Sequence, residues 1–301
     1  MTYSVLLIGA TGDVGSKIAA KLAKYKGQLK RVAFLTSTAK STPEKEAKYA
    51  EVPIERVVGD FEDPETYRGF DIVICAIHDA FVLDQIKYFD AAFAAGVKHV
   101  YPTEFGADLT HPVVSKEPYA VGKIEARKQL EERARKDQSI GYTYVITGMF
   151  SDFILRPHVN VLGLSEDRRS AKFLGAPDAV LTTTHTEDIG EFTVLSTLPS
   201  HLKSFNERRT LAVEGSTHKV SEYFGAVSRY LGHPIDVEYL SRESSYVYEE
   251  EQKAQRNLEA VRYNSVLRTV GFGACVLQDV ANSSYPELKA RTWEETVKQM
   301  L

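Results

Sequence analysis

The sequence contains few cysteines. The two among its 301 residues, Cys75 and Cys275, lie far apart in the apolar runs DIVICAI and GFGACVL. No histidine or further cysteine stands at the spacing that would complete a metal site. We therefore expect two buried free thiols in a reducing compartment and no bound metal.

The sequence also lacks an excess of positive charge and any long apolar run. Its 37 basic and 41 acidic residues give a net charge of −4, so the field that attracts nucleic acid or anionic membranes is missing. No apolar run reaches the roughly 18 residues of a membrane-spanning helix. The N-terminus enters a strand at once, without the charged and then apolar segment of a signal peptide. These absences predict a cytoplasmic protein whose partners are neither nucleic acids nor membranes.

Short Val/Ile/Leu runs alternate with amphipathic segments through the first half of the chain. The runs are YSVLLIG, RVAFLT, IERVVGD, DIVICAI, HVYPTE and YTYVITG. Continuous apolar strands are buried on both faces, which favours a parallel sheet with helices on each side. We expect an α/β fold with a doubly wound, Rossmann-type NAD(P)-binding domain at 1–152 and a smaller α+β substrate-binding domain at 153–301. Segments around 179–215 are candidates to return to the first sheet, and RRSAKFLGAPDAVLTTTH is typical of a hairpin.

The first strand runs directly into GATGDVGSK, which carries Gly9, Gly12 and Gly15 with a helix opening behind them. The glycines permit a tight turn and let backbone N–H groups approach a pyrophosphate at the positive end of the helix. In the first strand-to-helix turn of an alternating chain, this pattern indicates a dinucleotide site. The remaining loop candidates for cofactor contact are Thr11, Asp13 and Val14. The alternative is an ordinary glycine-rich turn.

The second strand ends in LTSTAKS, where NAD enzymes commonly place a carboxylate for the ribose hydroxyls. Thr36, Ser37 and Lys40 stand there instead. Hydroxyls and an amine suit a 2′-phosphate, which favours NADP over NAD. A solvated polar loop is the alternative, because no arginine follows the strand.

The third and fourth strands end in further candidates for cofactor contact. Asp60 and Phe61 follow the third strand and could meet the adenine. Ala76, Ile77 and His78 follow the fourth, at the carboxyl edge where open α/β sheets bind ligands. His78 could equally be a loop histidine without a catalytic role.

The stretch EPYAVGKIEAR places Tyr119 four residues before Lys123. If both lie in the first turns of a helix, they share one face. The pair is then a candidate catalytic acid with its activating lysine. The alternatives are an ordinary helix surface for the pair and a packed ring for Tyr119.

The segments AGVKHVYPTEFGAD, GKIEARKQLEE, YTYVITGMFSDF and THTEDIG resemble the NmrA-like branch of atypical short-chain dehydrogenases/reductases. Within that branch, the chain is most similar to the isoflavone reductase and phenylcoumaran benzylic ether reductase group. The resemblance implies an NADPH-dependent reductase with a Rossmann lobe, a catalytic lysine at Lys123 and loop contacts at residues 9, 11, 12, 14 and 15. Two departures stand out. The family's arginine after strand two is replaced by Thr36, and Tyr119 restores the Tyr-x-x-x-Lys of the wider superfamily.

In that wider superfamily, the tyrosine transfers the proton, the lysine lowers its pKa and holds the ribose, and a Ser or Thr assists. Thr103, in YPTEFG, stands at the matching strand end. After strand six, Gly148 and Phe150 are candidates for cofactor contact. Phe105, Met149 and Phe153 are candidates for an apolar substrate wall, although ordinary core packing explains each of them equally well.

We therefore expect an NADPH-dependent reductase of a small aromatic or conjugated substrate, acting as a monomer or homodimer. Two other functions remain. One is a non-catalytic, NADP-binding redox sensor of the NmrA type, which Lys123 argues against because such sensors lack the lysine. The other is a nucleotide-sugar epimerase or dehydratase, which also uses Tyr-x-x-x-Lys but which the PTEFG block and the short chain disfavour.

Overall fold

The structure, a computed structural model, describes residues 2–39 and 41–301. The chain forms two compact units and passes between them several times. The first unit comprises Met1–Phe105, Gly122–Val145 and Ile189–Leu211, and the second comprises Gly106–Val121, Ile146–Asp188 and Ala212–Leu301. We expected a boundary near residue 152 with a possible return of segments around 179–215, and the chain crosses between the two units after residues 105, 121, 145, 188 and 211. The second unit is only slightly shorter than the first.

The first unit is built on a parallel sheet in the order β10-β6-β5-β4-β1-β2-β3. Its strands are β1 (Ser4–Ile8), β2 (Arg31–Ser37), β3 (Glu55–Gly59), β4 (Ile72–Cys75), β5 (His99–Tyr101), β6 (Gly141–Ile146) and β10 (Arg208–Ala212). The order reverses direction at β1, as a doubly wound sheet requires. The expected Rossmann-type α/β fold is confirmed, and β10 returns to the sheet from within the segment 179–215.

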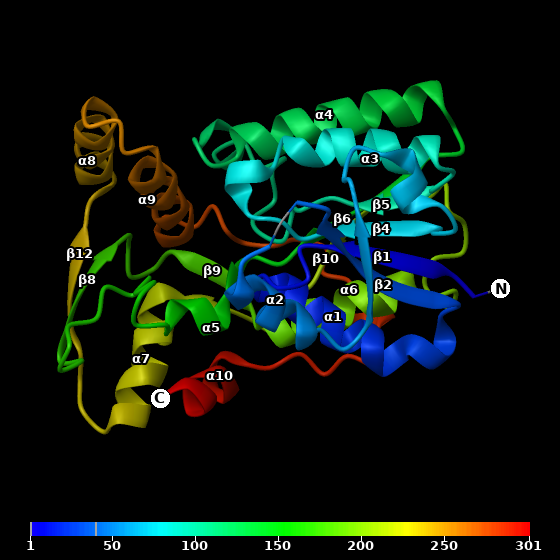
Figure 1. Cartoon of the computed structure of the whole chain (residues 1–301). Coiled ribbons are helices and arrows are strands. Elements are labelled where there is room, and N and C mark those ends of the chain that lie inside the picture. The colour runs from blue at the N-terminus through cyan, green and yellow to red at the C-terminus, as the bar shows by residue number, and fades with distance from the viewer. Residues whose placement is uncertain (1, 40) are drawn as a thin grey trace. The chain divides into compact units, whose positions relative to one another are not determined.

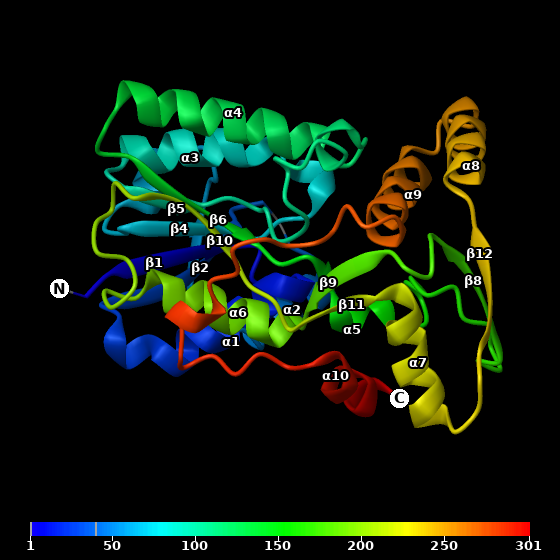
Figure 2. The ribbon, with the colours of Figure 1, turned by 180° about the vertical axis from the view of Figure 1, so that it is seen from behind.

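Helices cover both faces of this sheet (Figures 1 and 2). They are α1 (Asp13–Tyr25), α2 (Pro43–Ala50), α3 (Asp84–Ala94), α4 (Val121–Lys136) and α6 (Thr186–Thr197), with the short turns η1 (Lys26–Gln28), η2 (Pro64–Tyr67) and η3 (Asp79–Phe81). On one face, Lys21 of α1 pairs with Glu191 of α6 at 2.8 Å. On the other face, Arg133 of α4 pairs with Asp90 of α3. The central strands are buried on both sides, which explains their unbroken apolar runs.

The second unit combines helices with two small sheets, ordered β11-β9-β7 and β12-β8. Its strands are β7 (Met149–Phe150), β8 (Ser170–Leu174), β9 (Val180–Thr184), β11 (Ser216–Lys219) and β12 (Asp236–Leu240). Its helices are α5 (Ser151–Ile154), α7 (Val220–Leu231), α8 (Arg242–Ala254), α9 (Leu258–Gly271) and α10 (Trp293–Met300), with the turns η4 (Val114–Lys116) and η5 (Asn282–Ser284). Its core gathers Phe173, Tyr223, Phe224 and Trp293.

The expectation that RRSAKFLGAPDAVLTTTH forms a hairpin is wrong. The two strands form, but β8 pairs in parallel with β12 and β9 pairs with β11 and β7. Each strand pairs with strands distant in the sequence. In the core, Phe173 of β8 packs edge-on against Phe224 of α7.

Three other features concern the cysteines, the apolar character of the helices and the possible metal ligands. Cys75 and Cys275 are buried free thiols, as expected, and burial raises the pKa of both, that of Cys275 to about 12. No helix in the described part of the chain is long and apolar enough to cross a membrane. Within residues 2–39 and 41–301, no group of three or more His, Cys, Asp or Glu side chains could hold a metal ion.

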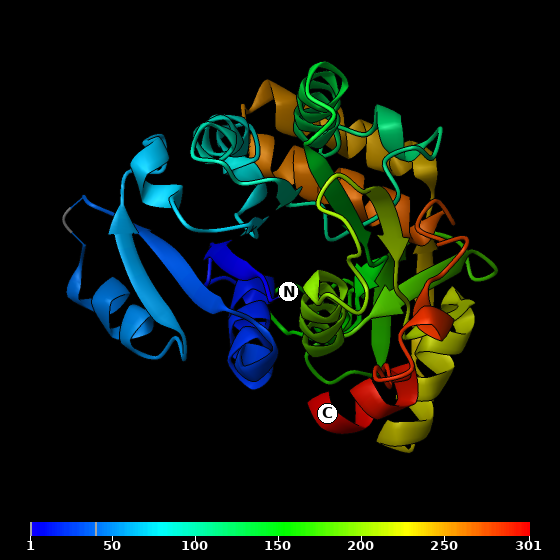
Figure 3. The same ribbon diagram turned by 90° about the vertical axis from the view of Figure 1, so that its right-hand side faces the viewer.

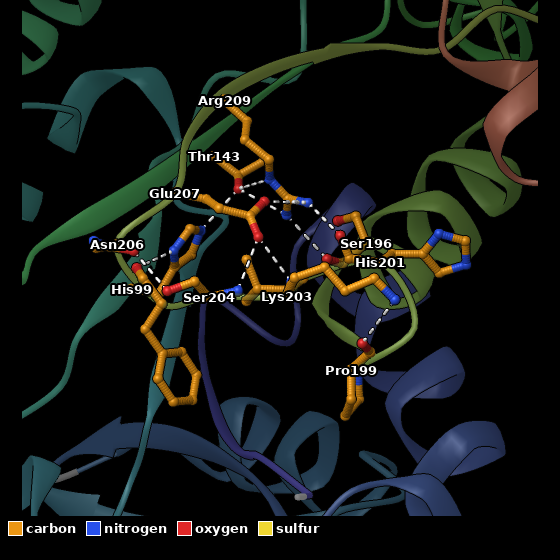
Figure 4. A network of polar contacts seen from close by, with 12 residues as sticks. His99, Thr143, Ser196, Pro199, His201, Lys203, Ser204, Asn206, Glu207 and Arg209 are labelled. Carbon is orange, nitrogen blue, oxygen red and sulfur yellow. Dashed lines mark hydrogen bonds and ion pairs between the residues drawn. The ribbon is translucent and has the colours of Figure 1, made fainter.

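A buried polar chain ties β10 into the sheet (Figure 4). Arg209 donates from Nε and Nη2 to the Thr143 hydroxyl at 3.2 and 3.1 Å. That hydroxyl lies 2.8 Å from His99 Nε2, and His99 Nδ1 lies 2.8 Å from the Phe205 carbonyl. Since a carbonyl can only accept, Nδ1 carries the proton and Nε2 accepts from Thr143. Each member therefore has one fixed direction of donation, and the imidazole is neutral.

This network makes stability dependent on pH. The pKa of His99 is lowered to about 3, mainly by burial; the bond to the Phe205 carbonyl opposes this shift and the positive charge of Arg209 adds to it. In the unfolded chain the His99 imidazole is protonated below about pH 6.5, whereas in the folded chain it is protonated only below about pH 3. Stability from this group is complete above pH 6.5 and is lost as the pH falls toward 3.

We predict that the free energy of unfolding falls by about 2 kcal/mol between pH 7 and pH 5 through His99 alone. Urea unfolding at several pH values measures this dependence. His99→Gln should flatten the profile, because the amide has no titrating proton. His158→Gln, at an exposed site, is the control and should retain the wild-type slope. An identical slope in both variants would contradict the assignment.

Candidate functional site

The turn between β1 and α1 has no room for side chains at two of its three glycines. Gly9 has φ +90°, and a Cβ there would lie 2.3 Å from the Ala76 carbonyl oxygen. A Cβ on Gly15 would lie 1.9 Å from the carbonyl oxygen of Gly9. A Cβ on Gly12 would meet that same oxygen at 3.4 Å, an ordinary contact. Gly9 and Gly15 are thus required by the fold itself, whereas the fold would accept a side chain at Gly12.

Gly12 is the N-cap of α1, and Asp13, Val14 and Gly15 form the first helical turn. The N–H groups of a first turn have no acceptor within their own helix and carry the positive end of its dipole. The loop therefore presents the positive end of α1, with open space at Gly12, and phosphate binding there stays a prediction.

A cavity of about 250 Å³ opens beside this turn at the carboxyl ends of β1, β2 and β4. Its walls are apolar, aromatic and hydroxyl-bearing: Ile8, Gly9, Ala10, Thr11, Phe34, Leu35, Thr36, Ser37, Tyr49, Phe61, Ile77, Phe81 and Tyr88. Among these walls, as far as the structure describes them, no carboxylate or amine is found. The space and lining fit a nucleoside, with rings such as Phe61 and Tyr88, 5.0 Å apart, available for a base.

Six of the residues proposed from the sequence for cofactor binding meet around this cavity. They are Gly9, Thr11, Thr36, Ser37, Phe61 and Ile77. Lys40 lies outside the described residues. The structure gives Asp60 and His78 local roles, because the Asp60 carboxylate accepts from the Glu62 N–H at 2.9 Å and His78 Nδ1 accepts from the Ala80 N–H at 3.1 Å.

A cation from the neighbouring strand lies at the end of β2, and the sequence analysis missed it. Arg56, from the neighbouring strand β3, donates from Nε to the Thr36 hydroxyl at 3.0 Å. The same hydroxyl lies 3.4 Å from the Val57 carbonyl, and Thr36 is buried. Arg56 is twenty residues from Thr36 in the chain, so only the pairing of β2 with β3 reveals this contact.

Lys123 lies in the first turn of α4, with its side chain 10% exposed. Its Nζ donates to the Glu104 carbonyl at 2.9 Å and lies 3.1 Å from Asp79 Oδ1. Asp79 belongs to the loop after β4, whose neighbours Ile77 and Phe81 line the cavity. Lys123 is therefore fixed beside the same loop that forms one wall of the nucleoside cavity.

The second residue missed from the sequence is Glu104, which anchors α4 through two groups. Its backbone carbonyl accepts from Lys123, and its carboxylate accepts two bonds of 2.9 Å from Arg127, one helical turn later. Arg127 also lies over the Tyr144 ring at 4.2 Å. Both charged partners are buried, and such a pair has a fixed geometry. The spacing of Lys123 and Arg127 on one helix face was the only signal in the sequence.

Thr103 and Phe105 flank Glu104 and are buried. The Thr103 hydroxyl donates to the Ile77 carbonyl at 3.0 Å, and its N–H donates to Gln85 Oε1 at 2.9 Å. Through its bond to Ile77, Thr103 holds the loop after β4 in place. Phe105 has φ +33°, a strained conformation for a bulky residue of the kind that is common at functional sites.

The helical spacing expected for Tyr119 and Lys123 is wrong. α4 begins at Val121, so Tyr119 lies in the turn before the helix, half-buried, and the i, i+4 relation does not apply. The turn belongs to the second unit, whereas α4 from Gly122 onward belongs to the first. Within the second unit, Glu117 pairs with Arg268 of α9, with Nε to Oε1 at 3.0 Å, and both are buried. That pair anchors the Tyr119 turn to α9.

The candidates after strand six lie in the second unit, near its core. Gly148 has φ +66°, and Met149 packs against the main hydrophobic cluster. The Phe150 and Phe153 rings meet edge-on at 5.0 Å, and the Arg156 guanidinium lies 3.8 Å from the centre of the Phe153 ring. These contacts hold the two aromatic rings in place.

Comparisons with known proteins agree with the resemblance drawn from the sequence. The model of the NmrA-like family matches residues 1–295. A phenylcoumaran benzylic ether reductase of Ginkgo biloba is 25% identical over 99% of this chain and 98% of its own length. The crystal structure of an isoflavone reductase superposes with a TM-score of 0.78 at 22% identity over 100% of both chains. The complex of leucoanthocyanidin reductase from Vitis vinifera with NADPH gives a TM-score of 0.74 at 20% identity, covering 99% of each chain.

The glycine geometry predicts different outcomes for two similar substitutions. Gly12→Ala should fold with nearly wild-type stability, because its Cβ meets only ordinary contacts, yet should bind NADPH at least about tenfold more weakly, because the methyl group occupies the approach to the backbone. Gly15→Ala should lose about 1–3 kcal/mol of stability, because its Cβ overlaps Gly9. Thermal unfolding and calorimetric titration measure the two effects. Unchanged NADPH affinity in Gly12→Ala would contradict the assignment of the glycine turn to the binding site.

Proposed function

Because this chain belongs to the NmrA-like family, we propose that it is an NADPH-dependent reductase of a small aromatic or conjugated substrate. The observation that carries the proposal is the position of Lys123. A lysine in the first turn of α4 is held by Glu104 and Asp79 beside the loop whose Ile77 and Phe81 line a nucleoside-sized cavity.

The lining of the cavity supports NADPH as the cofactor. Where an NAD enzyme places a carboxylate at the end of β2, this chain places the hydroxyl side chains of Thr36 and Ser37. The adenosine half would occupy the cavity, and the pyrophosphate would meet the N–H groups of the turn at Gly12. When bound, NADPH supplies the hydride of the reduction.

Lys123 would orient the nicotinamide ribose or the substrate oxygen. An ammonium group has three N–H donors, and two of them point at the Glu104 carbonyl and the Asp79 carboxylate. The third is then available for a ligand oxygen. The two fixed contacts select one side-chain conformation, which reduces the entropy lost when the ligand is held.

The substrate class is proposed from the related proteins and the aromatic residues of this chain. The names of the similar proteins, phenylcoumaran benzylic ether reductase and isoflavone reductase, refer to reductases of aromatic compounds. In this chain Met149, Phe150 and Phe153 are candidate walls for an aromatic ring, and the contacts of Phe153 with Phe150 and Arg156 hold its ring rigidly. Phe105 is a further candidate, because a strained backbone of this kind is common at functional sites.

Lys123→Ala tests the reductase function. NADPH consumption with a panel of aromatic enones, imines and benzylic ethers should fall at least about 10²-fold, because a positioned group for proton transfer is lost. NADPH affinity should change less than about tenfold, since one contact among many is removed. Lys128→Ala, at an exposed position of the same helix, is the matched control and should keep full activity. Full activity in Lys123→Ala would refute the mechanism, and NADPH binding without turnover of any compound would favour the redox sensor.

Tyr119→Phe tests the remaining half of the Tyr-x-x-x-Lys pattern. The ring is kept and only the hydroxyl is lost, so packing of the turn before α4 is preserved. Since Tyr119 precedes the helix, we expect a supporting role and a fall in kcat below about tenfold. A positioned proton donor would instead contribute about 10² to 10⁴. Single-turnover rates across pH separate the two, and a loss above a hundredfold would identify Tyr119 as the acid.

A further inference from the structure

Arg56 lies against the wall of the nucleoside cavity without lining it. Its Cα is paired with that of Phe34 in the register of β2 and β3, and its side chain runs along the sheet toward the carboxyl end of β2. There its Nε reaches the Thr36 hydroxyl at 3.0 Å. Its guanidinium also lies 4.6 Å from the centre of the Tyr49 ring. Thr36 and Tyr49 both line the cavity, so the cation is in contact with two of its wall residues.

This contact supplies the positive charge that the walls themselves do not carry. The described lining residues include no lysine or arginine, and the residues from Thr36 to Ala39 are likewise uncharged. The Arg56 side chain is 31% exposed, so its guanidinium is accessible to a ligand from solvent. Figure 3 shows α2, which carries Tyr49, beside β2 and β3 at the edge of the sheet.

The guanidinium is held in one orientation by three partners. Nε bonds to Thr36, the face lies over Tyr49, and the two terminal nitrogens donate to the Glu46 carboxylate at 2.6 and 3.0 Å. A planar fork that binds a carboxylate through two parallel bonds fits a phosphate in the same way. The Glu46 side chain is 46% exposed, and exposed ion pairs of this kind contribute little. Its displacement by a dianionic phosphate is therefore inexpensive.

We propose that Arg56, reaching across from β3, is the residue that recognises the 2′-phosphate of NADPH, and that Glu46 occupies its fork until the cofactor displaces it. The proposal rests on the proposed use of NADPH and specifies the residue that selects it. Thr36 then acts as a positioning residue, since its hydroxyl holds Nε and thereby orients the two terminal nitrogens of the guanidinium. The arginine required for a 2′-phosphate comes from the neighbouring strand instead of the end of β2.

The test compares the affinities of Arg56→Ala for NADPH and NADH, and for 2′,5′-ADP and 5′-ADP, by calorimetry. Affinity for NADPH and for 2′,5′-ADP should fall about ten- to a hundredfold, the range of a charge-assisted pair. Affinity for NADH and 5′-ADP, which lack the phosphate, should be unchanged. Arg56→Lys should lose less than Arg56→Ala, because it keeps the charge but not the fork.

Arg31 provides a matched control at the opposite end of β2. It too forms a two-bond pair with a glutamate, Glu55, and its guanidinium lies 4.3 Å from the centre of the Phe70 ring. Arg31→Ala therefore removes an equivalent exposed pair and ring contact and should leave all four affinities unchanged. If it reduced NADPH affinity as much as Arg56→Ala does, net charge would explain the effect and the proposal would be overturned.

Glu46→Gln tests the displacement. Without the competing carboxylate, NADPH should bind about two- to fivefold more tightly, and NADH should be unaffected. Weaker NADPH binding in this variant would overturn the proposal that the phosphate displaces Glu46. An NADPH preference that survives Arg56→Ala would refute the role of Arg56 while leaving the reductase intact. A wild-type protein that bound neither dinucleotide would refute the proposed function as well.

Discussion

The close approach of three backbone segments around the first glycine turn is the constraint on which the binding site depends. Gly9 faces the Ala76 carbonyl and Gly15 faces the Gly9 carbonyl at distances that leave no space for a Cβ. Only glycine allows β1, the loop after β4 and α1 to come together in this way. Their convergence places the positive end of α1 at the rim of the cavity and fixes the wall that includes Ile77.

The loop after β4 connects the nucleotide cavity with the candidate catalytic lysine. Its Ile77 and Phe81 face the cavity, its Asp79 faces Lys123, and the Ile77 carbonyl accepts the Thr103 hydroxyl. Behind it, Glu104 holds Lys123 and Arg127 on one face of α4. The cavity walls and the amine are thus connected through the loop after β4 by Asp79 and Ile77.

Three buried or half-buried arginine networks stabilise elements of the two units, two networks in the first unit and one in the second. Arg127 joins α4 to Glu104 and Tyr144, Arg209 joins β10 to β5 and β6, and Arg268 joins α9 to the turn that carries Tyr119. Each guanidinium has several acceptors, so its burial is compensated by directed bonds. Removing one partner would leave a charge without compensation, which costs more than the bond itself.

The sequence alone determined the Rossmann-type sheet, the glycine turn, the two buried thiols and the family, because these depend on local periodicity and on short motifs. It also pointed to six of the cavity residues, since the carboxyl ends of parallel strands meet at one edge. Only the tertiary structure decided what depends on contacts between distant residues. The pairing of β8 with β12 and the start of α4 after Tyr119 left no local signal. For the anchoring of Lys123 by Glu104, the spacing of Lys123 and Arg127 on one helix face was the only signal. Arg56 is the clearest case, because a cation twenty residues from Thr36 reaches it only once β2 and β3 have paired.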